Sequence, residues 1–337
     1  MKETKSLKKT KVKKQHYVPR AYLKNFCTNG EQLYVLDKSQ RKYFKANIKD
    51  IACGNYFYDI DAEDSQSFEK SLGVFEAAYA AIFDNLIQKL NAVKNNTPSN
   101  LLEVFLKKIG LLHKKNINLT PSERLVIAGF FAVQYLRTAH TRQEITQTSQ
   151  KLFEIISSMS DEVEKPDGFY PSYQDDSAMT SLHVNLIKEL GEQCARYLME
   201  QKWIFGINRS SRPLFTSDNP AILDTSFCKN GLIRNDGFMS PDVQFYLPLN
   251  KDFVLLIIEK SFYKKYKQLI SNQNIRDFND DTILYSNNLQ LNRCFFQVYS
   301  NTDKFFEDEK NFCIKNNVDG NKNRKLIWSN QDHLIEN

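Results

Sequence analysis

Glycine is scarce in this sequence, with 11 residues in a chain of 337. The chain contains no G-x-x-x-x-G-K-[ST] phosphate loop, no G-x-G-x-x-G dinucleotide-binding turn and no G-x-S-x-G motif. Such motifs need glycine because the backbone must turn sharply and approach a phosphate or a nucleophile closely. Their absence argues against nucleotide binding through a glycine-rich loop.

Cysteine patterns that build disulfide frameworks or zinc sites are also absent. None of the six cysteines forms a C-x-x-C pair, and no histidine stands at zinc-finger spacing from one. Six cysteines would make a sparse disulfide framework for this length, so reduced thiols are expected. The chain also lacks a run of 18 apolar residues and an apolar segment near its N-terminus of the kind found in secretory signals. We therefore predict a cytoplasmic protein that does not span a membrane.

The net positive charge is concentrated at the N-terminus. Residues 1–20 carry eight basic side chains against one acid, a net charge of +7; because the whole chain carries +6, the rest sums to −1. The eight are Lys2, Lys5, Lys8, Lys9, Lys11, Lys13, Lys14 and Arg20. We predict a flexible basic arm over residues 1–14 that contacts DNA or RNA phosphates, with Lys13 and Lys14 among its binding residues. The alternative is a frayed tail that only adds solubility.

Hydrophobic periodicity divides the chain into a helical part and a strand-rich part. Apolar residues recur at spacings of three and four from Phe68 to Leu90, which predicts an amphipathic helix over 67–93. Thr120, Pro121 and Glu123 form a capping box, and the helix they start is predicted to continue to about residue 159. Further helices are predicted at 100–113, 177–202, 261–271 and 281–291, with a loop at 160–176. Strands are predicted at 31–36, 42–44, 55–59, 203–208, 213–217, 243–249, 252–258 and 293–300.

Helices dominate about 65–202 and strands dominate about 203–300, which predicts an α+β fold rather than an alternating α/β fold. We expect the central helical region to pack on a mainly antiparallel sheet built from the C-terminal strands plus the N-terminal strands. Residues 15–312 would form a single domain, and residues 313–337 a peripheral polar tail.

The most site-like segment is His16-Tyr17-Val18-Pro19-Arg20, where the arm meets the predicted domain. A histidine at this point can serve as a metal ligand or as a general base near neutral pH. The alternative is a structural histidine bonded to a backbone carbonyl. Tyr17 and Arg20 are candidate binding residues beside it.

Polar residues on the predicted helices supply further candidates. Glu69 and Glu76 are two turns apart and border an apolar stripe, where carboxylates can bind a metal or act as acid and base. Gln134 and Arg137 interrupt an apolar surface. A buried arginine needs an anion, which here is one of those glutamates or a bound phosphate. His183 lies in an apolar column and is either a metal ligand or a satisfied core residue.

The segment Ser217-Asp218-Asn219-Pro220 follows a predicted strand. A strand end can present Asp218 to a cleft as a magnesium or manganese ligand or as a base, with Asn219 as a binding residue. The alternative is a turn in which both side chains bond their own backbone.

Together these segments resemble a bacterial family of domains of unknown function, the one numbered 4238. The resemblance covers about residues 14 to 300, in the family's order. It rests on His16-Tyr17-Val18-Pro19-Arg20-x-Tyr22-Leu23-x-Asn25-Phe26, on Glu69 and Glu76, on Gln134-x-x-Arg137-Thr138, on Thr216-Ser217-Asp218-Asn219-Pro220, on Leu247-Pro248-Leu249, and on an Asn at 287–288. The family often has Pro after Arg-Thr, where this chain has Ala139. The resemblance implies site candidates but no reaction.

Two functions from different classes fit these residues. The first is a metal-assisted phosphodiesterase or nuclease with a role in bacterial defence, using Mg²⁺ or Mn²⁺. Its catalytic residues would be His16, Glu76, Arg137 and Asp218, and its metal ligands would come from His16, Glu69, Glu76, His183 and Asp218. The alternative is a non-catalytic nucleic-acid- or protein-binding module, in which the same residues form a structural network. An RNA-binding toxin or regulator acting through the arm is a third possibility.

Overall fold

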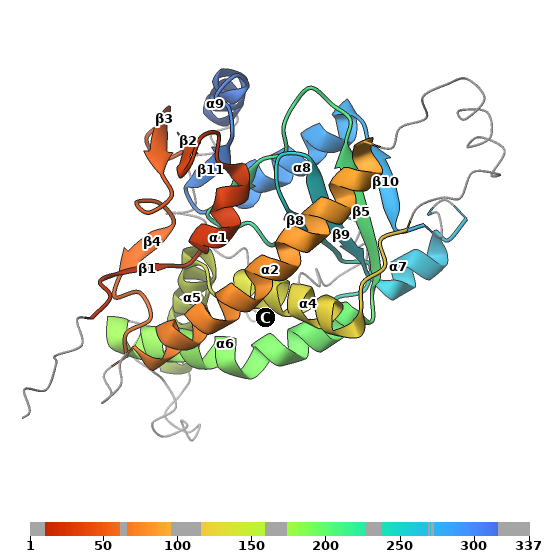
Figure 1. Ribbon diagram of the computed structural model, residues 1–337. Coiled ribbons are helices and arrows are strands. Elements are labelled where there is room, and N and C mark those ends of the chain that lie inside the picture. Colours follow the sequence, from red (N-terminus) through yellow and green to blue (C-terminus); the bar gives the residue numbers. More distant parts are fainter. Residues whose placement is uncertain are drawn as a thin grey trace, which may run out of the picture.

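The computed structural model describes residues 11–60, 66–95, 116–158, 174–226, 237–268, 270 and 273–315. It confirms the α+β class, with long helices on one side of the molecule and strands in separate sheets (Figure 1). The predicted helix at 100–113 lies outside the described residues, as do nearly all of the predicted loop and most of the basic arm.

Four long helices come from the middle of the chain: α2 (Ser67–Asn95), α4 (Pro121–Leu136), α5 (Ala139–Ser157) and α6 (Asp176–Met199). Helix α4 packs against both α2 and α6 and is the central one. The predicted capping box is confirmed, because Thr120 Oγ1 accepts from the Glu123 amide and the Glu123 carboxylate accepts from the Thr120 amide at 2.8 Å.

A break at Arg137–Thr138 separates α4 from α5, so the prediction of one helix to about residue 159 is wrong. Arg137 ends α4 with φ −88° and ψ −2°, and Thr138 is extended, with φ −77° and ψ 160°. Thr138 Oγ1 accepts from the Thr141 amide and thereby caps α5. The apolar period runs across this position, but the backbone leaves the helix there.

The strands of the described residues form three sheets rather than the one that the sequence predicted. A five-stranded sheet has the order β10 (Ile275–Phe278), β5 (Lys202–Asn208), β9 (Phe253–Ile258), β8 (Gln244–Pro248) and β7 (Ile222–Asp224). All its pairs are antiparallel except β10 with β5. A four-stranded antiparallel sheet has the order β3 (Lys42–Asn47), β2 (Gln32–Asp37), β11 (Gln297–Ser300) and β6 (Thr216–Ser217). The N-terminal strands therefore join β11 and β6 and not the main sheet.

Shorter elements complete the described chain. Strands β1 (Lys14–His16) and β4 (Cys53–Asn55) form an antiparallel pair, so only Asn55 of the strand predicted at 55–59 lies in a strand. A short helix, α1 (Arg20–Leu23), follows β1 and continues into a 3-10 turn over Lys24–Phe26. Towards the C-terminus lie α7 (Lys260–Lys265), α8 (Asp280–Arg293) and α9 (Phe306–Lys315). No helix in the described ranges has the length and apolarity that a membrane crossing requires.

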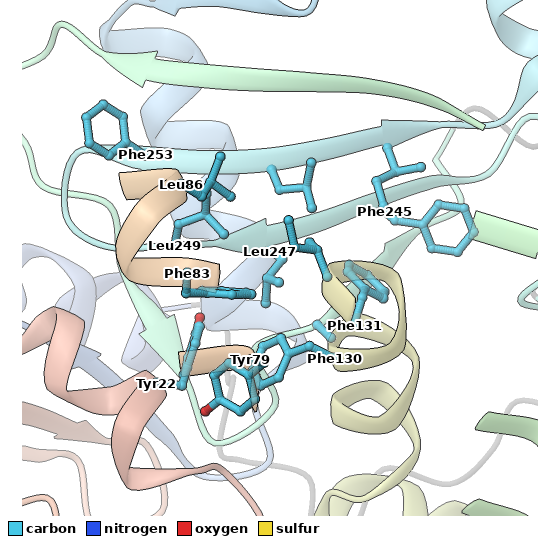
Figure 2. Close-up of a cluster of buried hydrophobic side chains, with 14 of the residues drawn as sticks. Tyr22, Tyr79, Phe83, Leu86, Phe130, Phe131, Phe245, Leu247, Leu249 and Phe253 are labelled. Carbon is cyan, nitrogen blue, oxygen red and sulfur yellow. The ribbon is translucent and has the colours of Figure 1, made fainter. Parts of the chain in front are cut away.

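The main core lies between α2, α4 and the five-stranded sheet (Figure 2). The rings of Tyr79 and Phe83 on α2 lie 4.2 and 4.9 Å from the ring of Phe130 on α4. Phe131 packs edge-on against Phe245 of β8, with centroids 5.7 Å apart. These side chains are buried, and each buried phenylalanine stabilises the fold by roughly 1.5–3 kcal/mol. The core thus fixes α2 and α4, which carry four of the candidate site residues.

Candidate functional site

The backbone of the His16–Tyr17 segment is held by two side chains of α4. Arg137 Nη2 donates to the His16 carbonyl at 2.5 Å, and Gln134 Nε2 donates to the Tyr17 carbonyl at 2.9 Å. The Tyr17 amide donates to the carbonyl of Ala52 at 3.0 Å. The two polar side chains that interrupt the apolar surface of α4 therefore dock the N-terminal segment.

Arg137 has all three of its nitrogens bonded within the protein. Besides the His16 carbonyl, it donates through Nη1 to Glu76 Oε1 at 2.8 Å and through Nε to the Tyr58 hydroxyl at 3.1 Å. Its side chain is only 2% exposed. Each nitrogen of this buried guanidinium thus already donates to a protein group, in the place where the sequence led us to expect either a glutamate or a bound phosphate. The anionic partner is Glu76, one of the two glutamates considered from the sequence.

The side chain of Asp218 is also buried and bonded to groups of the protein itself. Its carboxylate accepts from the amides of Phe295, Phe296 and Gln297 at 2.7, 2.7 and 2.9 Å, and the residue is 1% exposed. Burial raises the pKa of Asp218 to about 6, although the three amide bonds and the charge of Lys38 oppose the rise. The carboxylate thus pins the start of β11 to the end of β6 instead of facing a cleft.

His183 on α6 is a buried residue with both ring nitrogens bonded. Nε2 lies 2.7 Å from the Leu136 carbonyl, and Arg142 donates from Nε and Nη2 to Nδ1 at 3.1 and 3.0 Å. Burial lowers the pKa of His183 to about 3, and the charge of Arg142 adds to the decrease. The histidine is therefore neutral and has no lone pair to offer a metal.

Hydrogen bonds also connect the other polar segments found in the sequence. Thr138 Oγ1 donates to Asn219 Oδ1 at 3.3 Å, which joins the α4–α5 break to the segment after β6. The Tyr22 hydroxyl lies 2.8 Å from Thr216 Oγ1 and donates to the Pro248 carbonyl at 2.6 Å. These bonds join parts of one network that ties the N-terminal segment to the helices and to a strand end.

A cavity of about 480 Å³ lies next to this network and collects a different subset of the candidates. We call it the N-terminal cavity. It is lined by Val12, Lys14, His16, Arg20, Lys49, Asp50, Glu69 and Glu76. Five expected site residues thus line one cavity, whereas Arg137, His183 and Asp218 do not line it. His16 and Asp218 do not share a cleft; the charge of Asp218 acts instead on Tyr17, where it adds to the effect of burial in raising the pKa of the phenol.

Glu69 is the most unusual group of this cavity. Its Oε2 atom is buried and has no hydrogen-bond partner among the described residues. Burial raises the pKa of Glu69 to about 7; the charge of Arg137 opposes this rise, and the charges of Glu76 and Asp59 add to it. A carboxyl group that exchanges its proton near neutral pH can act as acid, base or pH-dependent cation ligand.

His16 supplies a second group that is neutral and reactive. Its Nε2 lies 3.2 Å from the Ile48 carbonyl and can donate to it, which assigns the proton to Nε2 and leaves the lone pair on Nδ1. Burial lowers the pKa of His16, the bond to Ile48 opposes this, and the nearby charges of Arg20, Arg137 and Lys14 lower it further. The imidazole therefore has a lone pair for a proton or a cation at neutral pH.

Basic residues surround the mouth of the N-terminal cavity. Lys14 pairs with Asp50 at 2.6 Å, and Arg20 pairs with Glu31 at 3.2 Å; all four side chains are about half exposed. Such pairs are worth at most about 1 kcal/mol, so an anionic ligand can displace the carboxylates. Lys49 is an exposed third cation. Lys13 is also exposed, and its carbonyl accepts from the Tyr56 amide, so this part of the predicted arm is bonded to the fold.

Within the described ranges, no three His, Cys, Asp or Glu side chains are arranged as a metal-binding group. The five metal ligands expected from the sequence are divided between the N-terminal cavity and two buried positions. Sequence reasoning also missed Val12 and the two charged cavity residues Lys49 and Asp50, which belong to the turn between β3 and β4. That turn resembles any exposed turn in the sequence, and only the pairing of β1 with β4 brings it to His16.

Comparison with known proteins gives a family and no reaction. Neither a curated protein nor a solved structure matches the chain. One family model matches residues 14–304, which is most of the chain and includes every expected site residue except Lys13. The chain therefore belongs to the family described as "Protein of unknown function (DUF4238)".

Proposed function

We propose that the protein is a phosphodiesterase that cleaves nucleic acid in the N-terminal cavity with the help of Mg²⁺ or Mn²⁺. The observation that carries the proposal is the buried, unpartnered Oε2 of Glu69 in a cavity that also holds His16 and basic residues. An oxygen with no protein partner is costly to bury, and a cation or a substrate hydroxyl would satisfy it.

In this proposal Glu69 anchors the cation. Magnesium is commonly held in proteins by one or two carboxylates, with water and substrate phosphates as the remaining ligands, so a cage of three protein ligands is not required. Glu76 lies seven residues along α2, about 10 Å in axial rise, and one of its oxygens is bonded to Arg137. We therefore assign Glu76 the task of positioning Arg137, which in turn holds the His16 carbonyl.

The other cavity residues take the remaining steps. Nδ1 of His16 would accept a proton from the attacking water, and a Mg²⁺ or Mn²⁺ ion held at Glu69 would supply positive charge for the phosphoryl oxygens. Lys14, Arg20 and Lys49 bind the flanking phosphates, with the basic N-terminal residues extending the contact along DNA or RNA. We place this activity in the cytoplasm, where it would act in defence against foreign nucleic acid.

The test is cleavage of single- and double-stranded DNA and RNA by purified protein with Mg²⁺, Mn²⁺ or a chelator. Glu69→Gln should lower the rate at least about 100-fold, whereas Glu192→Gln on the exposed face of α6 should leave it unchanged. Because the cation competes with a proton on Glu69, activity at limiting Mg²⁺ should rise between pH 6 and pH 8, around the pKa of about 7. No cleavage with either metal, or a Glu69→Gln variant as active as the unmodified protein, would refute the proposal.

The buried network favours a second candidate, a nucleic-acid-binding module without catalysis. Arg137, His183 and Asp218 are all satisfied by protein groups, as a structural network requires. In that case a Lys14→Gln, Arg20→Gln, Lys49→Gln triple variant should lose salt-dependent binding to DNA or RNA, while Glu69→Gln should bind normally.

A further inference from the structure

A second cavity, of about 490 Å³, lies where the N-terminal end of α4 meets the edge of the five-stranded sheet. We call it the α4–β5 cavity. It is lined by Asn116, Ile117, Asn118, Leu119, Arg124, Gln201, Lys202, Trp203, Phe205 and Asn274. None of the described lining residues is acidic, in contrast to the N-terminal cavity with its three carboxylates. Its charge and its amide side chains therefore suit an anionic ligand with hydrogen-bonding groups.

One wall of this cavity is fixed by the side-chain amide of Asn274, which pairs with the backbone N–H and C=O of Ile117 as a neighbouring strand would. The Ile117 amide donates to Asn274 Oδ1 at 3.0 Å, and Asn274 Nδ2 donates to the Ile117 carbonyl at 2.6 Å. The Asn274 amide donates in turn to Asn116 Oδ1 at 3.2 Å. The segment before α4 is thus held against Asn274, the residue that precedes β10. These bonds fix the shape of the cavity opening without a ligand.

Arg124 is the group that gives the cavity its specificity. Its guanidinium carbon lies 4.4 Å from the centre of the Trp203 ring, and it donates through Nε to the Met199 carbonyl at 3.0 Å and through Nη2 to the Gln201 carbonyl at 2.7 Å. Within the described part of the chain no carboxylate pairs with it. The two bonds orient one edge of the guanidinium, and the other edge retains three N–H donors.

The positive charge of the half-buried Arg124 is not neutralised by any carboxylate of the described residues. Burial lowers the pKa of Arg124, and no neighbouring acid offsets the effect. The charges of Arg124 and Arg276 both add to the effect of burial in lowering the pKa of Lys202, so three cations lie close together. An anion bound in the cavity would be attracted by all three charges.

We propose that the α4–β5 cavity is a binding site for the phosphoryl group of a small ligand of about mononucleotide size. The outward edge of Arg124 matches two phosphoryl oxygens, and Lys202 supplies a second positive charge. The exposed Asn118 offers an amide group for the remainder of the ligand, within a volume typical of small-molecule sites. The site is separate from the proposed catalytic cavity, with which it shares no lining residue.

Trp203 provides a local reporter for this proposal. The chain has one other tryptophan, Trp328, so a Trp328→Phe protein emits tryptophan fluorescence from the cavity alone. Titration with inorganic phosphate, adenosine monophosphate and adenosine distinguishes the sources of the group. We expect a saturable change with adenosine monophosphate at a dissociation constant of about 1 mM or below, a weaker one with phosphate and none with adenosine.

Variants in the same background identify the residues responsible. Lys202→Gln should weaken binding about tenfold, and Arg124→Gln at least as much, since hydrogen bonds to charged groups contribute about 1.5–3 kcal/mol. Arg124 also bonds two carbonyls, so Lys202→Gln decides the question if Arg124→Gln unfolds. Arg196→Gln, on the exposed face of α6, is the matched control, and Arg20→Gln in the other cavity should not affect the titration. Equal binding of adenosine, no saturable change with any probe, or unaltered binding by Lys202→Gln would overturn the proposal.

Discussion

His183 makes a specific contribution to the pH dependence of stability. In the folded protein one ring nitrogen donates to the Leu136 carbonyl and the other accepts from Arg142. A proton on Nδ1 would remove that acceptor and place a second positive charge against the guanidinium. The imidazole therefore stays neutral in the folded chain down to its pKa of about 3, whereas the unfolded chain protonates it near the ordinary value of 6.5.

The sign and the size of the effect follow from this difference. Between pH 6.5 and pH 3 the unfolded state binds a proton that the folded state does not, so stability falls as the pH falls. The loss is about 1.4 kcal/mol for each pH unit below 6.5, or about 2 kcal/mol at pH 5. Above pH 6.5 the contribution of this group is constant.

Urea denaturation of the unmodified protein and of His183→Gln, each at pH 7 and pH 5, measures this contribution. Glutamine can donate to the Leu136 carbonyl and accept from Arg142, but it does not titrate. The variant is expected to be less stable at pH 7, because it loses ring contacts with Phe57 and Tyr58. It should nevertheless lose about 2 kcal/mol less than the unmodified protein between the two pH values. Equal losses in the two proteins would show that His183 is not held neutral, and the argument would fail.

Three further substitutions test the network and the helix start. Asp218→Ala leaves three part-buried amides without their acceptor and should lower the free energy of unfolding by about 3 kcal/mol or more, measured by urea denaturation; a loss below about 1 kcal/mol would contradict the structural role. Tyr22→Phe removes a buried hydroxyl that bonds Pro248 and Thr216, with an expected loss of about 1–2 kcal/mol in the same assay, and unchanged stability would contradict those bonds. Thr120→Ala removes the capping box of α4 and should lower stability by about 1 kcal/mol, with Thr148→Ala on the exposed face of α5 as a control that should have little effect.

Local signals in the sequence were sufficient for much of the fold. The spacing from Phe68 to Leu90 gave α2 nearly to its ends, and the capping box at Thr120 fixed the start of α4. The end of α4 was missed although Thr138 is a good cap, because the apolar period continues beyond it. The division into sheets could not be predicted, since β11 pairs with β2 from near the start of the described chain and with β6 from its middle, and local patterns carry no information on such partners.

Only some of the predicted site residues line the N-terminal cavity, because the sequence does not show the partners of a polar side chain. His16, Glu69 and Glu76 were recognised as polar groups beside a core and do line one cavity. Asp218 and His183 have the same appearance in the sequence, but their partners are backbone amides and carbonyls. A sequence does not show which backbone groups lack partners, so it cannot separate a network residue from a residue that faces a ligand. Only the geometry makes that distinction.

The docking of the N-terminal segment has a consequence for synthesis of the chain on the ribosome. Val18, Tyr22, Leu23 and Phe26 are made before the helices and strands that they pack against, and all four are buried in the finished protein. The partners of Tyr22 lie 194 and 226 residues further along. At a synthesis rate of about 5–20 residues per second, the segment waits roughly 10–45 s before its binding groove exists. During that interval its apolar side chains are exposed, and the lysines that precede them keep the emerging chain charged and disfavour its association with other nascent chains.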